Sequence, residues 1–237
     1  MEMNNTGTLR RPVSRVEVTN AFLRSVYNWM AAGLGLTALI SVALTYTSLG
    51  AFLFTPQGVY IGFGCIIAEL VLVFMLSLRI QKLSAQAATM MFMGYSALNG
   101  VSISFVLAAY TASSVAGAFI TCTGMFAGMS LYGLVTKRDL TSLGSFLSMG
   151  VIGLLIAMVV NMFLGSTMMD LIISVVGVGL FLGLTAYDTQ FLKEMGESVP
   201  QNDATAVRRG TIIGALKLYL DFINLFIMLL RLMGDRR

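Results

Sequence analysis

The sequence predicts an all-α integral membrane protein with seven transmembrane helices. Of its 237 residues, 57% are hydrophobic and only 11% are charged, whereas an average soluble protein carries about 25% charged residues. A water-soluble chain of this size could not cover its surface with so few charges, which nearly excludes a soluble enzyme. The chain contains no histidine, so a Ser-His-Asp triad, a histidine-dependent zinc site and a histidine-ligated haem are excluded as well.

Seven apolar runs have the length of about 20 residues that crosses the hydrocarbon core of a bilayer. Each run must be helical, because within lipid every backbone polar group needs an internal hydrogen-bond partner. The runs are Ser25–Thr47, Gly58–Leu78, Ala87–Tyr110, Ser114–Val135, Leu143–Leu164, Leu171–Phe191 and Thr211–Leu232. We therefore expect two parts: a polar cytoplasmic head over residues 1–24, and a seven-helix transmembrane domain over residues 25–237.

Basic residues between the runs predict the orientation of the chain, because cytoplasmic connections carry an excess of Lys and Arg. The arginine-rich head should lie in the cytoplasm, together with three connections that contain basic residues. The first contains Arg79 and Lys82, the second Lys137 and Arg138, and the third Lys193, Arg208 and Arg209. The other connections carry at most one charge and should lie outside. A full seventh crossing puts Arg231, Arg236 and Arg237 outside, against the rule. The alternative is a last helix that re-enters and returns, and we favour crossing because Thr211–Leu232 is long enough.

Charged residues inside the runs are candidates for function, because a charge at bilayer depth costs several kcal/mol unless it is paired or hydrated. Lys217 and Asp221 are one helical turn apart and share a face, so they form either an internal ion pair or a titratable centre beside an aqueous cavity. Asp188 either has a functional role or simply lies at a helix end in the headgroup region. Glu69 either has a functional role or makes a structural hydrogen bond to a neighbouring helix. Arg79 at a span end could simply reach the interface with its long side chain.

Spacing alone does not establish a contact between the two aspartates. If Lys193 and Arg209 mark the cytoplasmic interface, a rise of about 1.5 Å per residue places Asp188 about 7 Å deep and Asp221 about 18 Å deep. Helix tilt or a water-filled vestibule would be needed to bring the two carboxylates together.

Two segments resemble the Bax inhibitor-1 (transmembrane Bax inhibitor motif) family, in its bacterial branch. The segment 214–226, GALKLYLDFINLF, is similar to the final helix of that family, and 186–190, AYDTQ, resembles its sixth-helix motif. The number of spans and the acidic residue in the second span fit as well. The resemblance implies six helices around a central hydrophobic seventh helix, in a multi-pass protein of the bacterial inner membrane with a cytoplasmic N-terminus.

The resemblance also implies an activity, a pH-sensitive calcium leak. In the family, an aspartate of the sixth helix and one of the seventh form a hydrogen-bonded dyad, and these correspond to Asp188 and Asp221. Arg79 is the nearest match to an arginine that latches the dyad, Glu69 matches the acid of the second helix, and Lys217 stands where a neutral residue is usual. Calcium is then the permeant ion, bound weakly and transiently by Asp188 and Asp221, and no cofactor is expected.

A shared proton provides the expected gate, because two nearby carboxylates in a medium of low dielectric cannot both ionise easily. The protonated pair would keep the pore shut, and ionisation of both aspartates would loosen the helices.

We expect no enzymatic activity, because the residues around the aspartates do not resemble an intramembrane aspartyl protease. The partners are the bilayer, calcium ions and protons, without nucleic acid. One alternative is a binding partner that modulates another membrane protein, such as a quality-control protease, or a stress response. Another is a proton-coupled transporter of a small solute.

Overall fold

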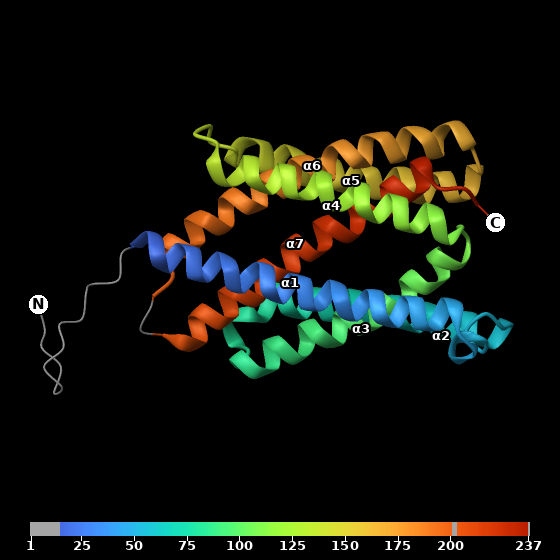
Figure 1. Cartoon of the computed structure of the whole chain (residues 1–237), viewed down its shortest axis with the longest axis horizontal. Coiled ribbons are helices and arrows are strands. Elements are labelled where there is room, and N and C mark those ends of the chain that lie inside the picture. Colours follow the sequence, from blue (N-terminus) through green and yellow to red (C-terminus); the bar gives the residue numbers. More distant parts are fainter. Residues whose placement is uncertain (1–14, 201–202, 237) are drawn as a thin grey trace, which may run out of the picture.

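The computed structural model describes residues 15–200 and 203–236, and these form long helices joined by short connections (Figure 1). The helices are α1 (Arg15–Tyr46), α2 (Pro56–Arg79), α3 (Ala85–Ala108), α4 (Ala112–Val135), α5 (Thr141–Leu164), α6 (Thr167–Ser198) and α7 (Ala204–Met233). All seven are long and apolar enough to cross a membrane. The prediction of an all-α protein with seven transmembrane helices is confirmed.

Side-chain caps fix where the helices begin, and so explain why the connections can be short. The backbone N–H groups in the first turn of a helix have no acceptor inside that helix, and the side chain of a capping residue accepts a hydrogen bond from one of them. The capping residues are Thr55 for α2, Ser84 for α3, Thr111 for α4, Ser166 for α6 and Asp203 for α7. After α5, Gly165 takes a left-handed conformation with φ of 61°, which ends the helix and lets Ser166 start the next one.

The first helix extends further than its apolar run, since α1 begins at Arg15 and not at Ser25. Phe22 in this extension is buried and lies against Gly196 of α6 and Gly210 of α7. Because α1, α6 and α7 pack together here, they continue as helices past the apolar segments. Residues 1–14 of the predicted head lie outside the described residues.

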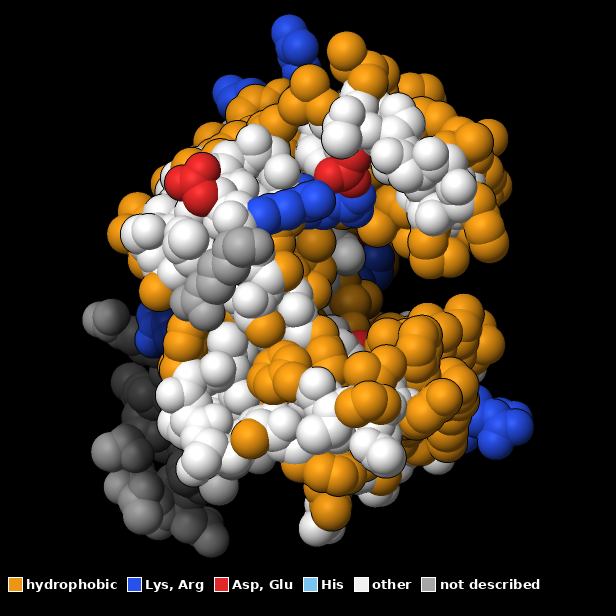
Figure 2. All heavy atoms as spheres, turned by 90° about the vertical axis from the view of Figure 1, so that its right-hand side faces the viewer, with side chains coloured by type: hydrophobic (Ala, Val, Ile, Leu, Met, Phe, Trp, Pro, Cys, Tyr) orange, Lys and Arg blue, Asp and Glu red, His pale blue; other side chains and the backbone are white. Residues whose placement is uncertain are grey.

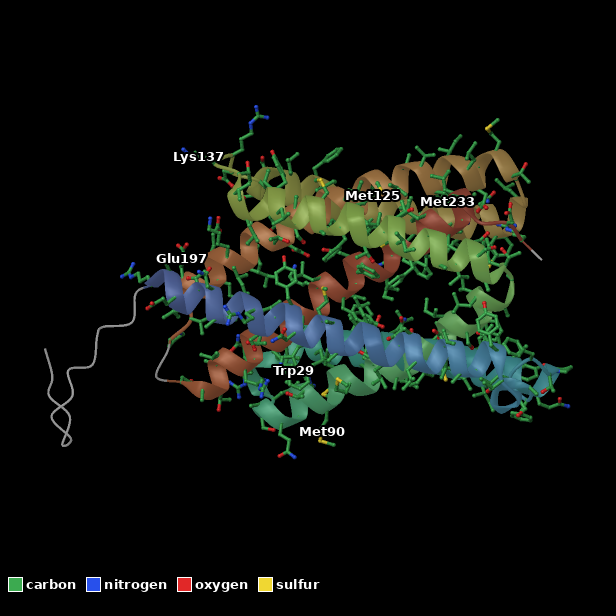
Figure 3. All side chains as sticks on the ribbon, in the orientation of Figure 1. Trp29, Met90, Met125, Lys137, Glu197 and Met233 are labelled. Carbon is green, nitrogen blue, oxygen red and sulfur yellow. The ribbon has the colours of Figure 1, made fainter. Side chains whose placement is uncertain are left out.

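The two ends of the bundle differ in charge. We call the end with the first turn of α1 the N-terminal end, and Figure 3 shows Lys137 and Glu197 at this end and Met233 at the opposite, C-terminal end. The helix ends and connections at the N-terminal end carry most of the basic residues between the spans: Arg79, Lys82, Lys137, Arg138, Lys193, Arg208 and Arg209. At the C-terminal end, Arg231 and Arg236 both contact Asp170.

The last helix is the centre of the bundle. In its most apolar 18-residue window, 72% of α7 is buried, against 11% to 44% in the other six helices. It packs against α1, α3, α4 and α6, while α2 covers α3 and α5 covers α6. It runs the length of the bundle without turning back (Figure 1), so it crosses and does not re-enter. The prediction of a central seventh helix is confirmed.

The outer helices form two groups, α1–α3 and α4–α6, with α7 between them. Figure 2 shows that the molecule is hollowed on one side between these groups. One stripe of α7 stays partly exposed because no neighbouring helix covers it, and its members recur every three or four residues. They are Ile213, Lys217, Leu220, Asn224, Ile227 and Arg231. The central helix thus presents one partly polar face that the other helices leave open.

Candidate functional site

Close packing positions the AYDTQ segment of α6. A Cβ atom at Gly133 of α4 would overlap the carbonyl oxygen of Ala186, and one at Gly144 of α5 would overlap the ring of Tyr187. Both glycines therefore permit contacts that any larger residue would block. As a result, α4 and α5 lie directly on the segment that carries Asp188.

Hydrogen bonds from the next two residues fix the rotation of α6. Thr189 donates to the hydroxyl of Ser130 in α4 at 3.4 Å. The Oε1 atom of Gln190 accepts from the backbone N–H of Leu140 at 2.8 Å, and its Nε2 donates to the carbonyl of Arg138 at 2.9 Å. With these two side chains tied to α4 and to the α4–α5 connection, Asp188 is directed toward α7.

Asp188 forms an ion pair with Lys217. The Nζ atom of Lys217 donates to Oδ1 of Asp188 at 2.9 Å, and Asp188 is only 5% exposed. The Lys217 side chain is 39% exposed, as expected from its place on the open stripe of α7, and its ammonium lies 5.4 Å from the centre of the Phe191 ring. The ion pair therefore joins a buried carboxylate to the open face of the central helix.

Asp221 completes this cluster, one helical turn beyond Lys217. It is 5% exposed, and its Oδ2 atom is buried without a hydrogen-bond partner among the described residues. Its charge interacts with those of Asp188 and Lys217, although no direct hydrogen bond joins the two carboxylates within residues 15–200 and 203–236. We call Asp188, Lys217 and Asp221 the α6–α7 cluster. A charged carboxylate oxygen without a donor is costly in such a place, so this buried oxygen, the one in the cluster without a partner among the described residues, is free to accept a proton or a cation.

Glu69 belongs to a separate group of hydrogen bonds. Its Oε2 accepts from Asn99 Nδ2 at 3.1 Å, and its Oε1 accepts from the Ser102 hydroxyl at 2.6 Å. The hydroxyl of Tyr219 in α7 donates to Asn99 Oδ1 at 2.9 Å and lies 2.6 Å from the hydroxyl of Thr37 in α1. We call these five residues the α1–α3 network, and it ties α1, α2 and α3 to the central helix.

Arg79 lies apart from both groups. It is exposed at the last position of α2, and it makes no ion pair or side-chain hydrogen bond with the described residues. Lys217 makes the contact with Asp188 that the family resemblance would assign to a latch arginine. The structure thus brings three of the five candidate residues together, places Glu69 in the α1–α3 network, and leaves Arg79 at the surface.

Sequence reasoning missed the uncharged members of the network. The signal was a polar stripe, because Ser96, Asn99 and Ser102 recur every three residues in α3, the spacing of one helix face. Tyr219 gave no signal of its own, because it carries no charge that would mark it inside an apolar run.

The donor set suits only weak cation binding. Among the described residues, no three or more Asp, Glu, Cys or His side chains gather into a possible metal site. Calcium takes six to eight oxygen ligands in a tight site, and here the Lys217 ammonium already occupies one oxygen of Asp188. Two aspartates of this kind are therefore too few for a closed calcium site.

The fold and the site together define a class: a seven-helix membrane protein whose central helix shares a cluster of two buried aspartates and one lysine with α6. The chain matches the family model described as inhibitor of apoptosis-promoting Bax1 over residues 19–237. It is 49% identical over 217 residues to inner membrane protein YbhL of Escherichia coli, which covers 91% of this chain and 92% of that protein. It is 42% identical over 221 residues to a protein of Deinococcus radiodurans, covering 93% of each chain. It is 39% identical over 230 residues to a protein of Borreliella burgdorferi, covering 97% of this chain and 98% of that one. The chain belongs to the Bax inhibitor-1 family.

Proposed function

We propose that the protein is a pH-sensitive calcium leak of the bacterial inner membrane, gated by protonation of the α6–α7 cluster. The observation that carries this proposal is the buried, unpartnered Oδ2 of Asp221 beside the Asp188–Lys217 ion pair. An ionisable group in the interior of a membrane bundle is a functional group by default. The inner membrane is the location that the name of the Escherichia coli relative gives.

One proton decides the charge of the cluster. With a proton on Asp221, the negative Asp188 and the positive Lys217 cancel, so α6 and α7 can stay packed. When Asp221 loses this proton as the pH rises, two carboxylates face one ammonium and the cluster carries a net negative charge. Repulsion between the carboxylates then loosens the contact of α6 with α7, and the oxygens attract a divalent cation. Flux should therefore rise with pH.

Lys217 limits how strongly an ion can bind. Its ammonium is a tethered cation on Asp188, so a calcium ion must displace it to reach both carboxylates. Weak binding of this kind suits permeation, because an ion that binds tightly leaves slowly. The half-exposed face of α7 that carries Lys217 gives the ion a path to the cluster.

The distribution of charge supports a cytoplasmic N-terminus. The N-terminal end of the bundle carries most of the basic residues between the spans, as the positive-inside rule predicts for a cytoplasmic face. Arg231 and Arg236 lie at the other end, where both contact Asp170. This pairing offsets part of their charge, so the seventh crossing conflicts less with the rule than the sequence implied.

The test is calcium entry into liposomes that hold the purified full-length protein, measured between about pH 6 and pH 8. We expect flux that increases with pH in the wild type, and a loss of this dependence in Asp188→Asn and in Asp221→Asn. Asp139→Asn removes an exposed carboxylate outside the spans and should behave as the wild type. Folded protein without flux above empty liposomes at any pH would overturn the proposal and favour the partner-binding alternative.

A further inference from the structure

A groove separates α1 from α4 over most of the bundle. These two helices scarcely touch each other, and two cavities of about 690 Å³ and 310 Å³ lie between them. The cavities are continuous, since both are lined by Leu34, Ala38, Phe119 and Phe222. We call this space the α1–α4 groove.

The lining of the groove is apolar, and several of the residues that line it have small side chains. Ala31 and Gly35 of α1 face Ala127 of α4 across the larger cavity, and Phe222 of α7 forms part of the floor. A Cβ atom added at Gly35 would meet no other atom within 4 Å. The small residues therefore leave room for an apolar chain between the two helices.

The N-terminal end of the groove opens into a polar mouth. A cavity of about 600 Å³ shares Tyr27 and Leu134 with the groove and is also lined by Arg15, Lys193 and Glu197. Figure 3 shows Glu197 at this end of the molecule. Two basic side chains against one acidic side chain give the mouth a positive balance.

The Lys193 ammonium marks where the polar mouth meets the apolar groove. Its Nζ donates to the carbonyl oxygen of Leu134 at 2.9 Å. No carboxylate of the described residues lies within ion-pair distance of it. An ammonium has three donors, so two of them remain for an anion.

We propose that the α1–α4 groove binds an anionic phospholipid, with its phosphate at Lys193 and Arg15 and an acyl chain between α1 and α4. Basic pockets between membrane helices on the cytoplasmic side bind such head groups, and this location rests on the orientation given under the proposed function. The length of the apolar groove also agrees with that of one acyl chain. From Tyr27 to Ala38, a rise of about 1.5 Å per residue gives about 17 Å, close to half of a hydrocarbon core of about 30 Å.

The bound chain would act on the central helix. Phe222 directly follows Asp221, and its ring packs edge-on against Phe119 and Phe126 of α4, with centroid distances of 5.6 Å and 5.4 Å. An acyl chain in the groove would cover the Phe222 side of α7 where it faces the space between α1 and α4. The lipid thus supports the packing of the helix that carries Asp221.

The test is native mass spectrometry of the detergent-purified full chain, titrated with phosphatidylglycerol, with phosphatidylcholine and with inorganic phosphate. We expect retained phosphatidylglycerol, much less phosphatidylcholine, and no retained inorganic phosphate. Lys193→Gln should weaken phosphatidylglycerol binding about fivefold, the effect of one basic residue near an anionic lipid. Lys137→Gln removes the same charge at the same end but outside the mouth, and should leave binding unchanged.

A second pair of variants tests the apolar part of the site. Gly35→Phe fills the groove and should abolish retention of the lipid, whereas Gly128→Phe on α4 should not. Both glycines have open space around an added Cβ atom, and only Gly35 lines the groove. Equal binding of the two lipids, or equal effects within either pair of variants, would overturn the proposal. Retention of inorganic phosphate alone would overturn it in favour of a free-anion site. The readout is binding in detergent, so it is independent of any failure of the calcium leak.

Discussion

The α6–α7 cluster and the α1–α3 network are built on the same central helix, yet they differ in how completely hydrogen bonds satisfy them. Lys217 and Asp221 belong to the cluster, and Tyr219, which lies between them in the sequence, belongs to the network on the other side of α7. Both oxygens of Glu69 accept hydrogen bonds. In the cluster, one oxygen of Asp221 has no partner among the described residues.

This difference separates a structural contact from a switch. A network in which each acceptor has a donor resists change, since any new charge state leaves a buried group unpaired. A cluster with a bare oxygen and a third charge next to it changes its net charge by a single proton. We therefore expect the α1–α3 network to hold α7 in place and the α6–α7 cluster to respond to pH.

The largest effect on stability should come from breaking the ion pair of the cluster. Lys217→Met leaves Asp188 as a buried charge without a partner, and such a loss costs about 3 kcal/mol or more. Reversible unfolding in mixed micelles measures it. The double variant Asp188→Asn with Lys217→Met should recover most of the loss, because both partners are then gone. A single variant as stable as the wild type would show that the pair contributes nothing.

A smaller effect should follow from breaking the network. Tyr219→Phe leaves the side-chain amide oxygen (Oδ1) of Asn99 without the hydrogen-bond donor that Tyr219 provides, at a cost of about 1 to 3 kcal/mol in stability. The pH dependence of calcium flux should stay, because no titrating group is removed from the cluster. Tyr60→Phe is the matched control, since Tyr60 is 78% exposed. A pH profile flattened by Tyr219→Phe alone would place the switch in the network and not in the cluster.

Much of the fold was predictable because length and hydropathy decide which segments cross a membrane. The extension of α1 before Ser25 was not predictable, because the contacts of Phe22 with α6 and α7 stabilise it. The sequence marked Asp188, Lys217 and Asp221 by their charge, and the family resemblance paired the two aspartates. Their meeting depends on how α6 and α7 lie against each other, and a count of residues along straight helices does not show that.

The smallest effect concerns an acid outside both regions. Hydrogen bonds from the side chain and backbone of Thr141 lower the pKa of Asp139 below its ordinary value. Because the pKa of Asp139 is lowered by folding, its ionised form stabilises the folded state at a pH above the ordinary pKa of an aspartate, about 4. This contribution is lost as the pH falls through the lowered pKa. Thr141→Val should move the pKa of Asp139 back toward its ordinary value, as carboxyl ¹³C NMR can measure. An unchanged pKa would contradict the role of the Thr141 side chain, and calcium flux should not change.

The most direct test of the central claim is infrared difference spectroscopy of the protonated carboxyl band in proteoliposomes, between about pH 6 and pH 8. In the wild type, this band should disappear as the pH rises. The band should be absent in Asp221→Asn and should remain in Glu69→Gln. A band that survives Asp221→Asn and is lost in Glu69→Gln would contradict a switch in the α6–α7 cluster, because the proton would then lie in the α1–α3 network.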